Sequence, residues 1–114
     1  MNIRENRIEV YHLPNGKRPF EIWLQNLNDK KTIARILQRL DRIRLGNFGD
    51  CKNLGAGVYE LRIFWGPGYR IYFGLLKFKA VLLLIGGDKA SQKKDVATAQ
   101  EYWKEFQKNA AQKL

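Results

Sequence analysis

Residues 59–94, YELRIFWGPGYRIYFGLLKFKAVLLLIGGDKASQKK, decide the fold of this chain. Apolar and polar side chains alternate on both sides of Gly66-Pro67-Gly68, which is the pattern of strands with one buried face. Glycine and proline between two such runs favour a turn. The first half of this stretch therefore predicts two antiparallel strands joined by a tight connection.

The predicted hairpin determines which side chains share a face of the sheet. A three-residue connection at residues 66–68 places Phe64 opposite Arg70 and Arg62 opposite Tyr72. Because side chains on paired positions project from the same face, we expect Arg62, Arg70 and Tyr72 on one side. Two guanidinium groups beside an aromatic ring suit a ligand rich in phosphate.

The second half of the stretch predicts a central strand. Residues 80–85 form a continuous apolar run, as expected for a strand that is covered on both faces. The run ends at Gly86-Gly87, where we expect a turn, and Lys89 follows at the rim of the same sheet.

The rest of the chain adds one strand and three helices. Residues 7–13 alternate like a strand, and apolar residues recur at helical spacing in residues 19–27, 30–45 and 91–112. The element order β-α-α-β-β-β-α predicts a single α+β domain spanning residues 1–114. Its core is a small antiparallel sheet of about four strands, with two N-terminal helices on one face and a C-terminal helix.

The second predicted helix carries a basic stripe opposite its apolar one. The stripe consists of Lys31, Arg35, Arg39 and Arg42. It is either a binding surface or a solvated helix face, and charge runs of this kind fit both interpretations.

The composition indicates the kind of partner. The 114 residues include 21 Lys and Arg against 11 Asp and Glu, so the formal net charge is +10. An excess of this size in a small domain favours a nucleic acid or an acidic protein as partner, while the alternative is a surface that only confers solubility.

Several functional classes are disfavoured by what the sequence holds. Cys51 and His12 are the single residues of their types, so we expect no disulfide, no metal and no cofactor. The first ten residues lack the apolar core of a signal peptide. Without a long apolar run we expect no membrane partner and a cytoplasmic location.

Four segments carry a resemblance to a known family. They are RIRLGNFGD at residues 42–50, ELR at residues 60–62, GPGYRIYF at residues 66–73, and LLIGGDKASQKKD at residues 83–95, followed by Ala99. With matching order and spacing, the chain from about residue 8 to 106 resembles the RelE/ParE superfamily of toxins from type II toxin–antitoxin modules. It is most similar to the HigB-like branch called addiction module killer proteins.

The resemblance implies a RelE-like fold and a toxin inhibited by a cognate antitoxin, of the helix-turn-helix, HigA-like type. It also implies a ribosome-dependent endoribonuclease, or mRNA interferase, that cuts messenger RNA and stops translation. The implied catalytic residues are Arg70, Arg62 and Lys89. The RNA-binding residues expected beside them are Tyr72, Lys93, Lys94, Arg39 and Arg42.

The chain departs from that family in its proton-transfer groups. A tyrosine that stacks on RNA in some RelE proteins has no counterpart near Val96, and the catalytic histidine of some HigB toxins is missing. Proton transfer then falls to Lys89, Lys93, Tyr72 or a ribosomal group. Arginines rarely release protons, so Arg62 and Arg70 are better suited to holding a phosphate.

Other interpretations remain open at this stage. Arg62 and Arg70 can instead pair with Glu60 and Asp88 across the sheet. The protein can also be a ParE-like inhibitor of DNA gyrase without nuclease activity, or an inactive relic that only binds its antitoxin. The nuclease hypothesis requires an uncovered Arg70, and it predicts that Arg70→Ala abolishes toxicity and leaves the fold intact.

Overall fold

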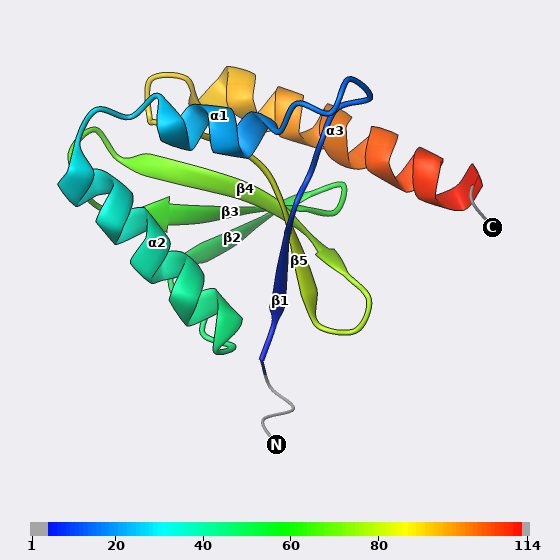
Figure 1. The fold of residues 1–114 in the computed structure, drawn as a ribbon, viewed down its shortest axis with the longest axis horizontal. Coiled ribbons are helices and arrows are strands. Elements are labelled where there is room, and N and C mark those ends of the chain that lie inside the picture. The colour runs from blue at the N-terminus through cyan, green and yellow to red at the C-terminus, as the bar shows by residue number, and fades with distance from the viewer. Residues whose placement is uncertain (1–4, 113–114) are drawn as a thin grey trace.

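A computed structural model describes residues 5–112 of the chain (Figure 1). The strands are β1 (Arg7–Val10), β2 (Cys51–Gly55), β3 (Val58–Ile63), β4 (Tyr69–Leu76) and β5 (Ala80–Gly87). The helices are α1 (Pro19–Gln25), α2 (Lys30–Arg44) and α3 (Gln92–Gln112). The predicted α+β class is confirmed. Residues 1–4, which belong to the segment inspected for a signal peptide, and residues 113–114 lie outside this range.

The five strands form one mixed sheet in the order β1-β5-β4-β3-β2. Strands β2, β3, β4 and β5 are antiparallel to their neighbours, whereas β1 pairs with β5 in parallel. The prediction of an antiparallel sheet of about four strands is therefore wrong in two respects. The first difference is the parallel edge strand. The second is β2, whose residues lie in none of the elements predicted from the sequence.

Helices cover both faces of the sheet. On one face, α1 and α2 bury Phe20, Ile36 and Leu40 against inward-facing residues of β3, β4 and β5. On the other, Ala99 and Trp103 of α3 pack on Val58, Leu82 and Leu84. Strand β5, which lies between β1 and β4, is therefore buried from both sides, as its apolar run predicts.

Three glycines in β4 and β5 allow these helices to approach. A side-chain carbon on Gly74 would collide with the ring of Trp103, and one on Gly86 would collide with Trp23. One on Gly87 would collide with the carboxylate of Asp95. Gly86 and Gly87 thus lie within β5, where they make room for α1 and α3, and the prediction of a turn there is wrong.

Within residues 5–112, no helix has the length and apolar character needed to cross a membrane.

Candidate functional site: a paired-arginine cluster beside α3

Arg62 of β3 and Arg70 of β4 are directly opposite each other in the sheet. The connection between the two strands spans residues 64–68, so the predicted three-residue loop is wrong and the pairing differs by two positions. A difference of two residues leaves every side chain on its predicted face. Arg62, Arg70 and Tyr72 therefore share one face, which is the face that α3 covers.

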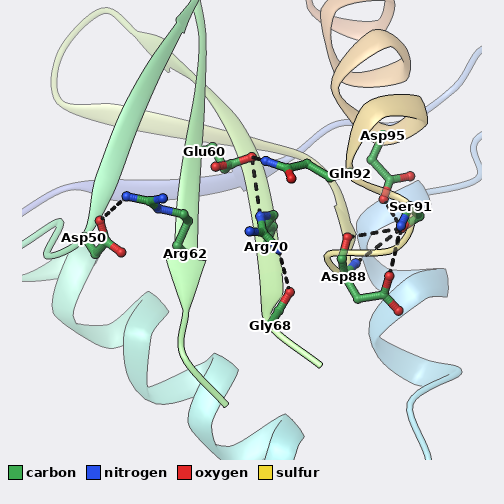
Figure 2. A network of polar contacts seen from close by, with 9 residues as sticks. All are labelled: Asp50, Glu60, Arg62, Gly68, Arg70, Asp88, Ser91, Gln92 and Asp95. Atoms are coloured by element: carbon green, nitrogen blue, oxygen red, sulfur yellow. Dashed lines mark hydrogen bonds and ion pairs between the residues drawn. The ribbon is translucent and has the colours of Figure 1, made fainter. Parts of the chain in front are cut away.

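Each of the two arginines contacts a carboxylate (Figure 2). Arg62 Nη2 donates to Asp50 Oδ1 at 3.1 Å. Arg70 Nε lies 3.7 Å from Glu60 Oε2, and Arg70 Nη1 donates to the carbonyl oxygen of Gly68 at 2.9 Å. Like charges on directly opposite positions repel, and these two acidic residues offset that repulsion.

Arg70 is largely covered. Its side chain is 13% exposed and that of Glu60 is 1% exposed. Gln92, the first residue of α3, donates its Nε2 to Glu60 Oε2 at 3.0 Å and so links α3 to the carboxylate that pairs with Arg70 (Figure 2). The expectation of an uncovered cationic surface is wrong at Arg70, because the start of α3 fixes the carboxylate that holds this guanidinium.

Arg62 and Lys89 are more open. The Arg62 side chain is 37% exposed, and Lys89 is exposed just beyond the end of β5. A side-chain carbon on Gly68 would stand 3.5 Å from Arg70 Nη1 and 3.7 Å from Lys89 Cβ. The fold therefore brings the three expected catalytic residues to one end of the sheet.

Lys93 and Lys94 lie near the same end. Both are exposed in the first turn of α3, directly after Gln92, which contacts Glu60. Ser91, the residue before the helix, bonds to Asp88 and Asp95, and this short polar network fixes the β5–α3 connection (Figure 2). The two lysines add positive charge to the rim of the site.

Tyr72 does not take part in the exposed surface. It is fully buried in the core under α3, so the prediction that it binds RNA is wrong. Burial raises the pKa of its hydroxyl, and the nearby Glu60 carboxylate raises that pKa further. Tyr72 therefore keeps its proton at neutral pH and cannot stack on an incoming base.

Arg39 and Arg42 do not join the site. Arg39 is half-buried and donates to two carbonyl oxygens, at 2.7 Å to Arg62 and at 3.1 Å to Phe48. Burial lowers the pKa of its guanidinium. Arg42 is exposed, but α2 packs on the sheet face opposite the Arg62 and Arg70 side chains. The prediction that Arg39 binds RNA is therefore wrong, because its guanidinium is already bonded to backbone carbonyl oxygens.

Incomplete hydrogen bonding marks the paired-arginine cluster. The buried side-chain nitrogen and oxygen atoms that lack a hydrogen-bond partner within residues 5–112 are Asp50 Oδ2, Arg62 Nε, Arg70 Nε and Tyr72 OH. All four belong to this cluster or adjoin it. Buried polar groups are normally satisfied, and the two donors among these four atoms are Arg62 Nε and Arg70 Nε. Asp50 and Gln92 were not predicted as site residues, since neither lies on the predicted hairpin.

Comparison with known proteins identifies a relative. An uncharacterized protein of Haemophilus influenzae strain Rd is 44% identical over 80 residues, which is 70% of this chain and 81% of that protein. The chain belongs to the same family as this Haemophilus protein. No protein-family model matches the chain. The relative's name states no activity, so the site's geometry has to support a function by itself.

Proposed function

We propose that the protein is the toxin of a type II toxin–antitoxin module of the RelE/ParE kind, acting as a ribosome-dependent messenger-RNA endoribonuclease. The observation that carries the proposal is the pair of facing arginines, Arg62 and Arg70, each of which has an Nε atom without a hydrogen-bond partner in the described part of the chain. The oxygens of a phosphodiester accept hydrogen bonds and carry the negative charge that two guanidinium groups bind best.

The chemistry is cleavage of RNA by its own 2′-hydroxyl. The 2′-oxygen attacks the adjacent phosphorus, the bond from phosphorus to the 5′-oxygen breaks, and a 2′,3′-cyclic phosphate and a 5′-hydroxyl result. Arg62 and Arg70 stabilise the charge that develops on the phosphate. Lys89, at the same end of the sheet, adds a third positive charge.

Proton transfer is assigned to fewer groups than the sequence suggested. Burial and the raised pKa of Tyr72 remove it from that role. Lys89 and Lys93 are exposed beside the cluster and remain, together with a group supplied by the ribosome. A site without a well-placed base depends on the ribosome to align the RNA, which is a gain from positioning.

Arg70 must move before it can bind a phosphate. Its guanidinium contacts Glu60 and the carbonyl of Gly68, so the uncovered Arg70 that the nuclease hypothesis requires is absent from this structure, and this counts against the proposal. A bound phosphodiester must therefore replace Glu60 as the partner of Arg70. Arg62, which is more exposed, makes the first contact.

The proposed partners follow from the charge of +10. The ribosome and messenger RNA are polyanions, and a cognate antitoxin with an acidic segment would cover the same basic surface. Such an antitoxin would be of the helix-turn-helix, HigA-like type. The proposed compartment is the cytoplasm, where translation takes place.

The closed state of Arg70 favours a second candidate, a ParE-like inhibitor of DNA gyrase. An inhibitor that only binds gyrase needs no arginine that is free to bind a phosphate. The Arg70 guanidinium held by Glu60 is therefore compatible with this function. An inactive antitoxin-binding relic fits the same observation.

Induced expression in bacteria separates these functions. Primer extension on cellular messenger RNA should reveal discrete cuts within translated codons, without a DNA-damage response. A DNA-damage response without RNA cuts would support gyrase inhibition and contradict the proposal. Normal growth on induction would support the relic.

A further inference from the structure

Phe64 is an exposed aromatic residue directly beyond the end of β3. Its exposed fraction is 79%, whereas its neighbour Ile63 is buried in the core. Single exposed apolar residues are common on protein surfaces, so exposure alone assigns nothing. What sets Phe64 apart is the charged group beside its ring.

The guanidinium carbon of Arg62 lies 5.9 Å from the centre of the Phe64 ring. This distance is within the range of a cation–π contact. Arg62 is in turn held by Asp50 at 3.1 Å, so the guanidinium next to the ring is fixed in place. The ring and Arg62 form one surface at the open side of the paired-arginine cluster.

We propose that Phe64 is a stacking platform for one base of single-stranded RNA whose phosphate contacts Arg62. The inference rests on the proposed function and adds to it the residue that binds the base. Aromatic side chains stack on bases of any identity, and basic neighbours hold the backbone of the same strand. Phe64 and Arg62 are two residues apart, which separates their Cα atoms by about 7 Å in an extended chain.

The surroundings of Phe64 favour RNA over a protein partner. An aromatic anchor for a protein sits at the centre of a well-packed contact surface that excludes water. Phe64 instead lies at the rim of the paired-arginine cluster, with Arg62 beside its ring. A base stacked beside a phosphate matches both features.

Phe78 provides a matched control within the chain. It is 88% exposed and lies in the turn between β4 and β5, flanked by Lys77 and Lys79. This turn is at the end of β4 opposite Arg70, about 20 Å away along an extended strand. Phe78 thus has the same side chain and basic neighbours in sequence, but lies far from the cluster.

The test is equilibrium binding of the full chain to a short fluorescent oligonucleotide. The RNA is 2′-O-methylated, so it lacks the hydroxyl needed for cleavage, and a second oligonucleotide of equal length has abasic residues. Phe64→Ala should weaken binding to the first by about tenfold, the loss expected for one stacked base. It should leave binding to the abasic one unchanged. Phe64→Trp should restore affinity, and Phe78→Ala should have no effect.

Three results would overturn the inference. They are no binding by the wild-type protein, no effect of Phe64→Ala, or an equal loss on the abasic oligonucleotide. Failure of this inference can be told apart from failure of the proposed function, because binding and RNA cleavage are measured separately. Base-dependent binding through Phe64 without RNA cuts in cells would sustain the platform and refute the nuclease. Messenger-RNA cuts that persist at full rate in Phe64→Ala, with unchanged oligonucleotide binding, would sustain the nuclease and refute the platform.

Discussion

Arg70 on β4 and Glu60 on β3 form an ion pair, in which Arg70 Nε lies 3.7 Å from Glu60 Oε2 and the Glu60 side chain is 1% exposed. The pair is both structural and functional in this account. It stabilises the junction of the sheet with α3. It also binds the guanidinium that we propose contacts the scissile phosphate.

Arg70→Ala should destabilise the protein, because it leaves the Glu60 carboxylate buried without its cation. The expected loss in the free energy of unfolding is about 3 kcal/mol, as for other broken buried pairs. The double variant Glu60→Gln/Arg70→Ala removes both charges and should recover part of that loss. Chemical denaturation measures all three proteins. If Arg70→Ala unfolds at the wild-type midpoint, the pair contributes nothing, and the earlier expectation of an intact fold holds.

Arg39→Ala should also lower stability. Arg39 donates to the carbonyl oxygens of Arg62 and Phe48, and so ties α2 to β3 and to the loop that follows α2. Two hydrogen bonds from a half-buried charged group should contribute about 2 kcal/mol. Arg42→Ala, one turn further on the exposed side of α2, is the control and should change stability by less than about 0.5 kcal/mol. Equal effects of the two substitutions on thermal unfolding would contradict a structural role for Arg39.

Asp29 should make the stability of α2 dependent on pH. Its carboxylate caps the helix by accepting from Lys31 N at 3.0 Å and from Thr32 Oγ1 at 2.9 Å. The bond from Thr32 is the main reason that the pKa of Asp29 lies below its ordinary value of 3.8. A lowered folded-state pKa means that this stabilisation is present above 3.8 and is lost as the pH falls through the folded value.

Thermal unfolding of Asp29→Ala and wild type checks this dependence. At pH 7 the variant should melt at a lower temperature, and the difference should shrink as the pH is taken below 3.8. A constant difference over this interval would show that the charged carboxylate is not the capping group.

Cys51 should react slowly with alkylating reagents. Burial raises the pKa of its thiol above 9.0, and the adjacent Asp50 raises it further. Since the thiolate is the reactive form, little of it is present at pH 7.5. Labelling with iodoacetamide should accelerate sharply when the protein is unfolded in urea. Rapid labelling of the native protein would contradict this environment.

The sequence predicted best those elements whose own side chains specify them. The 3.6-residue spacing of Ile36, Leu40 and Ile43 identified α2, and the apolar run of β5 identified a strand covered on both faces. A period of two also placed Arg62 and Arg70 on one face, and this survived an error in loop length because the pairing differed by an even number of residues.

The sequence could not predict what depends on packing from elsewhere. Strand β2, CKNLG, has a single large apolar residue and pairs through its backbone with β3, so it carries no pattern of its own. The alternation in β4 assigns Tyr72 to a face but does not show that α3 covers it. The same limit applies to Arg70, whose partner Glu60 is held by Gln92 at the start of α3.

The most direct test of the central claim is cleavage of ribosome-bound messenger RNA by the purified protein, mapped by primer extension. Wild type and Glu60→Gln, which keeps Arg70 and releases it from its carboxylate, should both cut within codons. The folded double variant Glu60→Gln/Arg70→Ala should not cut. Cleavage by the double variant, or none by the wild type, would contradict the claim that Arg70 acts on the scissile phosphate.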